Sequence, residues 1–121
     1  MMSDKKVEEP MQEEVFQCNL QEKWLALMLS GEKSIEGRLH RDKWTTLKVG
    51  QKVCINKKHF FILKEILRYA TFKELIESQG SKVFPNMSLE AGLKVYFEEI
   101  KFSREDEKTY GVVGLRLEKV K

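Results

Sequence analysis

Residues 31–38, Gly-Glu-Lys-Ser-Ile-Glu-Gly-Arg, limit the possible folds of this chain more than any other segment, because helix-type sequence changes to strand-type sequence within them. The apolar run from Trp24 to Leu29 precedes the segment and predicts a helix over about 21–30. Gly31 follows that run at the place where a left-handed glycine commonly ends a helix. We therefore expect a helix, a tight turn and a strand in direct succession.

The predicted strand carries charged side chains on one face. Residues 34–39 alternate with a period of two, so successive side chains point to opposite faces of a sheet. The face suited to a core holds Ile35, Gly37 and Leu39, and the face suited to a cleft floor or to solvent holds Ser34, Glu36 and Arg38. Lys33 is expected at the mouth, where the turn meets the strand. This grouping suits recognition of an anion or a polar base edge; the alternative is a cross-strand Glu–Arg pair on a wet sheet face, worth about 0.2–1 kcal/mol.

The remaining patterns predict strands that are far apart in the sequence, with helices between them. Strands are predicted over 15–18, 34–39, 52–55, 60–67 and 111–117. The run 60–67 is apolar on both faces early on, so pattern alone also allows a helix; its β-branched and aromatic residues favour a strand. Helices or helical turns are predicted to begin at Thr71, Ser88 and Ser103, the first with a capping box that includes Glu74.

This order of elements, β-α-β-β-β-α-α-β, favours an α+β fold with a small, closed or nearly closed β-barrel and flanking helices. We expect one domain over 15–121, preceded by a disordered acidic leader over 1–14. The barrel interior is predicted to be lined by the apolar phase of each strand: Ile35, Leu39, Val53, Ile55, Phe61, Val113, Leu115 and Leu117. Trp24, Leu27 and Met28 are expected to pack over one end of the barrel.

Composition indicates the class of protein. A chain of 121 residues with 34% charged and 41% hydrophobic residues is typical of a soluble globular protein. No apolar run approaches the ~20 residues of a membrane span, and no secretory signal is evident. Cys18 and Cys54 lie in apolar, strand-like sequence and are expected to be reduced core residues, while His40 and His59 are isolated. These features predict an intracellular monomer, cytoplasmic or nuclear, without membrane association, cofactor or metal.

Positive charge is concentrated in the middle of the chain. The net charge is −4 over 1–32, +7 over 33–68 and zero over 69–121. A basic segment of this kind is the footprint expected for a phosphate backbone. Solvated lysines on strand edges, which block aggregation, give a similar count. Trp44 and Tyr69 lie within or beside the basic segment and either stack on a nucleobase or pack at the barrel rim.

Two parts of the sequence together carry a family resemblance. The segment Gly31–Arg38 resembles the signature Gly-x-Lys-x-x-Glu-x-Arg of the ASCH (activating signal cointegrator homology) family. The second half, above all Phe84-Pro85 and the run from Ser103 to Tyr110-Gly111-Val112-Val113, resembles that of small stand-alone members. The resemblance spans roughly residues 15–120. It implies a β-barrel similar to the PUA (pseudouridine synthase and archaeosine transglycosylase) RNA-binding domain, with the signature lining a cleft and RNA or another nucleic acid as ligand.

The resemblance also implies an enzymatic alternative. Some small ASCH members remove the acetyl group from acetylated cytidine nucleosides with a lysine, a threonine and a glutamate. Lys33 matches that lysine, whereas Glu36 stands where the threonine would be, and no acid lies beside Pro85-Asn86, where the glutamate falls. If the chain is an enzyme, Glu36 would activate a water and Lys33 would stabilise the developing negative charge.

Two functions therefore remain open: a nucleic-acid-binding module, and a small hydrolase acting on a modified nucleoside or on RNA. In the binding module, Arg38 would donate to a phosphate or base, Lys33 would neutralise phosphate, and Glu36 would accept from a base amino group. The full set of expected nucleic-acid contacts is Lys33, Glu36, Arg38, Arg41, Lys43, Trp44, Lys57, Lys58 and Tyr69.

Overall fold

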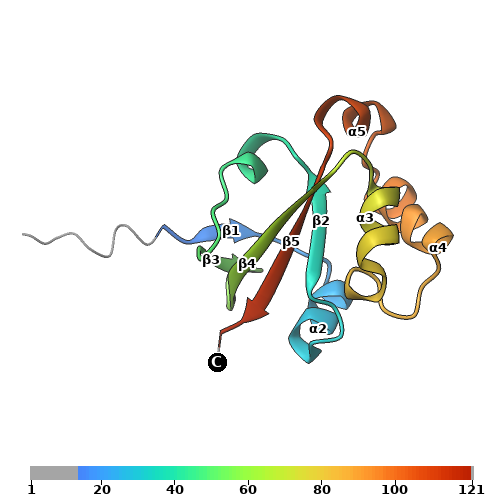
Figure 1. Cartoon of the computed structure of the whole chain (residues 1–121). Helices are drawn as coiled ribbons and strands as arrows, with labels where there is room; N and C mark the ends of the chain where they lie inside the picture. The colour runs from blue at the N-terminus through green and yellow to red at the C-terminus, as the bar shows by residue number, and fades with distance from the viewer. Residues whose placement is uncertain (1–13, 121) are drawn as a thin grey trace, which may run out of the picture.

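Five strands form one curled sheet within residues 14–120, the part of the chain that the computed structural model describes. The strands are β1 (Phe16–Cys18), β2 (Ile35–Leu39), β3 (Lys52–Ile55), β4 (His59–Tyr69) and β5 (Val112–Lys119). Their order across the sheet is β1-β3-β4-β5-β2, with β1 parallel to β3 and every other pair antiparallel. The sheet curls into a half-barrel whose two edges are β1 and β2 (Figure 1). The predicted α+β barrel with flanking helices is therefore confirmed, as is the assignment of 60–67 to a strand.

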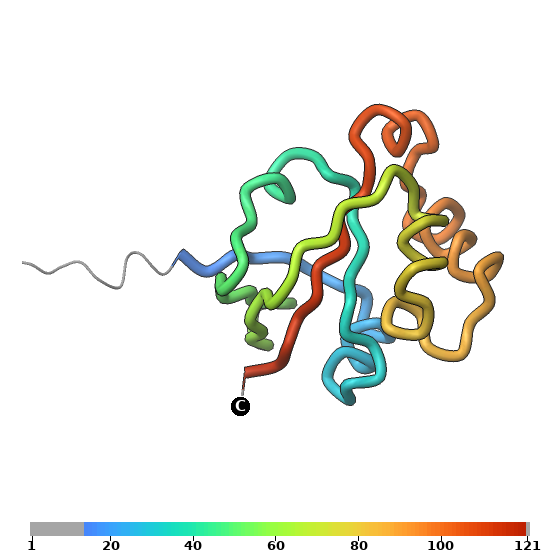
Figure 2. The backbone as a smooth tube through the Cα atoms, viewed as in Figure 1, coloured from blue at the N-terminus to red at the C-terminus, as the bar shows by residue number. Residues whose placement is uncertain are grey.

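The helices begin and end at residues that the sequence marks. They are α2 (Glu22–Ser30), α3 (Phe72–Gln79), α4 (Leu89–Lys94) and α5 (Arg104–Tyr110). Each predicted N-cap hydroxyl accepts a backbone N–H three residues on, as Thr71 does from Glu74, and Gly31 ends α2 with a φ of 88°. The chain trace places α2 and α5 at opposite ends of β2 and α3 beside β2 (Figures 1 and 2). The leader predicted over 1–14 lies, apart from Glu14, outside the described residues.

The end of α4 departs from the expected pattern. After Lys94 the chain continues as a π-helix over Val95–Glu99. The wider turn lets two successive aromatic residues reach the same partner: the Tyr96 ring stacks on Phe72 with centroids 4.0 Å apart, and Phe97 meets Phe72 edge-on at 5.8 Å. The backbone then runs directly into residues 100–103, which become one wall of the candidate site.

The register of β2 corrects one prediction about the core. Glu36 pairs with Leu115 and Arg38 with Val113, and cross-strand partners point to the same face of a sheet. The inner, concave face therefore holds both charged residues, whereas Ile35 and Leu39 lie on the outer face. All eight residues expected in the barrel interior are buried, but placing Ile35 and Leu39 there was wrong. The reason is that β2 is buried on both faces, because α3 covers the outer one.

Two opposed glycines allow α3 to approach the sheet closely. Gly37 of β2 pairs with Gly114 of β5, and Leu75 of α3 packs over both. A Cβ atom at Gly37 would lie 2.6 Å from the Leu75 Cδ2 atom, and one at Gly114 would lie 2.9 Å from Leu75 Cδ1. Gly114 is therefore a point of close approach between β5 and α3. Of the three residues expected over one end of the barrel, Trp24 and Met28 are buried and Leu27 is partly buried against the core.

Candidate nucleic-acid interface

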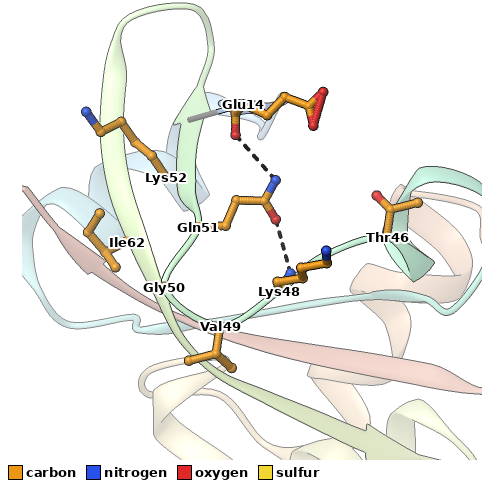
Figure 3. A pocket seen from close by; sticks show the side chains of 8 residues that line it. All are labelled: Glu14, Thr46, Lys48, Val49, Gly50, Gln51, Lys52 and Ile62. Atoms are coloured by element: carbon orange, nitrogen blue, oxygen red, sulfur yellow. Dashed lines mark hydrogen bonds between the residues drawn. The ribbon is translucent and has the colours of Figure 1, made fainter. Parts of the chain in front are cut away.

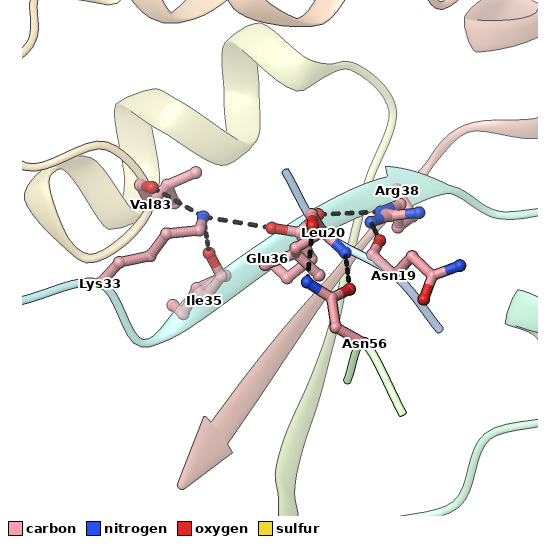
Figure 4. Close-up of polar contacts among 8 residues, drawn as sticks. All are labelled: Asn19, Leu20, Lys33, Ile35, Glu36, Arg38, Asn56 and Val83. Carbon is pink, nitrogen blue, oxygen red and sulfur yellow. Dashed lines mark hydrogen bonds and ion pairs between the residues drawn. The ribbon is translucent and has the colours of Figure 1, made fainter. Parts of the chain in front are cut away.

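Lys33, at the start of the signature segment, is buried rather than at an open mouth. Its side chain is 1% exposed, and its ammonium group donates to the Ile35 and Val83 carbonyl oxygens at 2.6 and 2.8 Å (Figure 4). The Lys33 Nζ atom also lies 3.3 Å from Glu36 Oε1. An ammonium group has three protons, and these three acceptors use them all. The expected position of Lys33 was therefore wrong: the turn after Gly31 directs the side chain under the sheet edge, toward residue 83.

Glu36 joins two cations from its place on the inner face of β2. One carboxylate oxygen meets Lys33, and the other accepts from Arg38 Nε at 2.8 Å. Burial raises the pKa of the Glu36 carboxyl group, but the charges and hydrogen bonds of Lys33 and Arg38 outweigh this effect and hold the pKa below its ordinary value. Burial lowers the pKa of the Lys33 ammonium group, and Glu36 opposes that shift. The Glu–Arg pair considered from sequence is thus a buried pair within one strand, not a wet cross-strand pair.

Arg38 links the two edge strands of the half-barrel. Its Nη2 atom donates to the carbonyl oxygen of Asn19, just beyond β1, at 2.8 Å. On the other side, its guanidinium group lies 4.6 Å from the centroid of the Trp44 ring. The segment that holds Asn19 is itself tied down, because the Asn56 side chain exchanges two hydrogen bonds with the backbone of Leu20 (Figure 4). Arg38 is 20% exposed, so part of its guanidinium group remains available to a ligand.

Two pockets flank Arg38 on this side of the molecule. A pocket of about 190 Å³ is lined by Arg38 together with Glu36, Gln21, Trp24 and Phe102, among others. A second pocket, of about 240 Å³, lies between Arg38, Arg41, Trp44, Lys101 and Phe102. Arg38 and Phe102 line both, so these two side chains form a shared wall. Each volume is below the roughly 300–1,000 Å³ of typical small-molecule sites.

Most of the other expected contact residues surround these pockets. Arg41 lines the larger pocket and forms ion pairs with Asp42 and Asp106 at 3.0 and 2.9 Å. Lys43 lies over the Trp44 ring at 5.3 Å and donates to the backbone carbonyl of Gln17 in β1. Trp44 also packs against Phe16 with ring centroids 5.1 Å apart, which matches packing at the rim, and its stacking on a nucleobase stays a prediction.

Two lysines extend the basic surface and one tyrosine lies apart from it. Lys57 and Lys58 are exposed in the β3–β4 turn, next to Asn56, whose amide contacts Leu20 at the edge of the smaller pocket. Tyr69 lies at the far end of β4, where its hydroxyl group bonds to Ser78 Oγ at 2.9 Å. Tyr69 lines neither pocket beside Arg38, and its contacts match packing at the rim.

Sequence reasoning missed the wall formed by residues 100–103. Lys101 adopts a φ of 69°, and Phe102 donates its N–H to the Tyr96 carbonyl at 2.9 Å. The side chains that line the pockets depend on the π-helix before them. The phenylalanine itself was visible in the sequence, but no periodicity predicts a π-turn, so nothing indicated where it would lie.

A larger pocket, of about 420 Å³, lies elsewhere and does not include the charged group of Lys33, Glu36 and Arg38. It is lined by Glu14, Lys48, Val49, Gln51, Lys52 and Ile62, among others (Figure 3). Its polar contacts are internal: the Gln51 side chain donates to the Glu14 carbonyl at 3.4 Å and accepts from the Lys48 backbone at 3.1 Å. Nothing in this pocket combines aromatic and cationic side chains in the way that the Arg38 region does.

Within 14–120, no group of three or more His, Cys, Asp or Glu side chains is placed to hold a metal ion. No helix of the described chain has the length and apolarity needed to cross a membrane. Cys18 and Cys54 are free and buried, as expected, and burial raises the pKa of the Cys18 thiol to about 11.

The curled sheet and its flanking helices define a PUA-like fold. The sequence profile of the ASCH domain matches residues 19–121, and the chain belongs to the ASCH domain family. No curated protein sequence matches the chain.

Solved structures agree with this assignment. The crystal structure of hypothetical protein PH0355 is 35% identical, with a TM-score of 0.83 over 88% of this chain and 100% of that one. The solution structure of protein PF0455 from Pyrococcus furiosus is 33% identical, with a TM-score of 0.76 over 89% and 99% of the two chains. ASCH from Zymomonas mobilis, at 17% identity and a TM-score of 0.60 over 85% of this chain and 66% of that one, shares the fold.

Proposed function

We propose that this protein binds single-stranded RNA, or a single-stranded segment of a structured RNA, across the pockets beside Arg38. The observation that carries the proposal is the position of the Arg38 guanidinium group, stacked on Trp44 and shared by two shallow pockets. Lys43 and Lys101 add positive charge around it. An aromatic face beside several cations is the arrangement by which proteins hold stacked bases and their phosphates.

The expected residues take different roles in this proposal. Arg38 contacts a phosphate or base directly, and Trp44 provides a stacking surface. Lys43, Lys57 and Lys58 contribute sequence-independent phosphate attraction from exposed positions. Lys33 and Glu36 act mainly through Arg38, because Lys33 is buried and both Glu36 oxygens already have partners.

The geometry favours binding over hydrolysis. As a general base, Glu36 would need a pKa near the working pH, but its two cationic partners hold that pKa low. Lys33 donates to three groups of the protein and has no proton left for an oxyanion. Each pocket beside Arg38 is also below the size of a typical substrate site. Reduced, buried cysteines support the further proposal of an intracellular protein.

The test is a titration of fluorescent single-stranded RNA at several salt concentrations. We expect the logarithm of the association constant to fall linearly with the logarithm of the salt concentration. Arg38→Ala should weaken binding by about 1–3 kcal/mol. Lys57→Ala and Lys58→Ala should each lower the salt slope by about one with a smaller, sequence-independent loss. Lys73→Ala, which removes the same charge from an exposed position on α3, is the matched control and should leave binding unchanged.

Two results would contradict the proposal. One is an affinity that does not change with salt, which would exclude a phosphate-dominated interface. The other is equal weakening by Lys73→Ala and Lys57→Ala, which would show attraction to net charge without a defined site. Acetylated cytidine should be incubated with the protein in parallel, because turnover that Glu36→Gln abolishes would favour the hydrolase instead.

A further inference from the structure

The two pockets beside Arg38 differ in the chemistry of their walls. The smaller places the Glu36 carboxylate and the Arg38 guanidinium group beside the apolar side chains of Trp24 and Phe102. The apolar side chains offer a surface on which a flat base can stack, beside the guanidinium group of Arg38. The indole N–H of Trp24 is buried and has no hydrogen-bond partner within residues 14–120.

The larger pocket suits a second base and the strand that carries it. Trp44 offers an aromatic face, and Lys101 provides a cation at the rim. Asp42 and Asp106 also line this pocket and both pair with Arg41, at 3.0 and 2.9 Å, so Arg41 adds no net positive charge there. The exposed Lys101 side chain forms no ion pair within the described residues, so it remains available to a phosphate.

The shared wall has an unused donor. Arg38 uses Nε for Glu36 and Nη2 for the Asn19 carbonyl, while Nη1 forms no hydrogen bond within residues 14–120. The guanidinium plane is held by these two bonds and by the Trp44 ring, and Arg38 belongs to the wall that both pockets share. A guanidinium group fixed in this way is a preorganised phosphate ligand.

We propose that the interface holds two consecutive nucleotides of a single strand, one base in each pocket, with the phosphate that joins them at Arg38 Nη1. This inference rests on the proposed function and deepens it, because it sets the smallest complete ligand at a dinucleotide. Each pocket alone is below the size of typical small-molecule sites, and Arg38, which carries the free donor, lies in the wall that the two pockets share.

The direct test uses the unmodified protein and ligands of increasing length. Binding of nucleoside monophosphates, diribonucleotides and triribonucleotides, in both uridylate and adenylate series, is measured by the change in tryptophan fluorescence and by calorimetry. A salt concentration of about 0.3 M suppresses the general attraction of added phosphates. We expect at least about a tenfold gain from one nucleotide to two, since stacking a second base is worth roughly 1–3 kcal/mol, and less than about a threefold gain from two to three.

Variants in each pocket separate the two subsites. Gln21→Trp places a bulky side chain at the rim of the smaller pocket, and Lys101→Gly removes a cation from the larger one at a backbone position that glycine adopts without strain. Either variant should reduce dinucleotide affinity toward that of the mononucleotide. Thermal unfolding of both variants, each changed at an exposed residue, verifies that the fold is retained.

The outcomes distinguish this inference from the function on which it rests. Equal affinity for mono- and dinucleotides, or a constant gain with every added nucleotide, would overturn the two-subsite arrangement while longer RNA still bound. Failure to bind long single-stranded RNA at low salt would overturn the proposed function as well. The inference is supported if affinity rises from one nucleotide to two and if Gln21→Trp and Lys101→Gly each remove this gain.

Discussion

Replacing Glu36 with glutamine should destabilise the protein strongly, because it leaves two cations without the carboxylate that pairs them. Lys33 is 1% exposed and would keep only its two carbonyl acceptors, whereas Arg38, at 20%, would keep Asn19 and the Trp44 ring. Breaking a buried ion pair on one side commonly costs about 3–5 kcal/mol. Because both cations retain other partners, we expect a value near the lower end, about 3 kcal/mol.

The assay is equilibrium unfolding in urea, with Lys33→Met and the double variant completing a cycle. Lys33→Met removes the buried ammonium group. In that background, Glu36→Gln should lower the free energy of unfolding by at least about 1 kcal/mol less than it does in the unmodified protein. The midpoint should shift without a change in the slope of unfolding free energy against urea. A loss below about 1 kcal/mol for Glu36→Gln, or additive effects in the cycle, would refute the view that the buried charges act as one unit.

Three further predictions concern Glu36, Cys18 and Gly37. The pKa of Glu36 is lowered in the folded state, so its contribution to stability is complete above the ordinary glutamate pKa of about 4.3 and is lost as the pH falls through the lower folded pKa. When the free energy of unfolding is measured in urea at several pH values, Glu36→Gln should remove this part of the acid dependence. Burial raises the pKa of the Cys18 thiol to about 11, so Cys18 should react with a thiol-disulfide reagent at pH about 8 only when the protein unfolds. Rapid labelling of Cys18 in the folded protein would contradict its burial. Gly37→Ala should destabilise by at least about 1–3 kcal/mol, because the added Cβ atom would meet Leu75 at 2.6 Å, whereas Gly50→Ala, with open space around it, reports only the cost of a positive φ.

Local signals in the sequence were sufficient for the starts of three helices and the end of α2. The caps at Thr71, Ser88 and Ser103 and the turn at Gly31 depend on side chains within a few residues, and each formed where predicted. The orientation of β2 was not predictable in this way, because its charged residues pair with one another on the inner face, so the polar phase of the strand does not mark the solvent side. Ile35 and Leu39 were thus placed on the wrong side although their burial was correct.

The site depended on contacts that span long stretches of chain. Lys33 reaches Val83, which is 50 residues away, and Arg38 reaches Asn19, so no local pattern could show that one cation is internal and the other partly free. The position of Phe102 follows from the π-helix before it, which ordinary periodicity does not encode. The signature Gly31–Arg38 correctly indicated which residues meet. Only the fold shows that Lys33 is buried and that Arg38 is partly exposed.

The central claim, that ligand binding occurs across the Arg38 region, is tested most directly by nuclear magnetic resonance of the labelled protein during titration with a short single-stranded RNA. The Trp44 indole and Arg38 Nε signals should shift with a common dissociation constant, together with the backbone signals of residues 101–103. Signals of Lys48 and Val49, which line the separate pocket of about 420 Å³, should stay in place. Shifts that cluster around Lys48 and Val49, with Arg38 and Trp44 unaffected, would contradict the account.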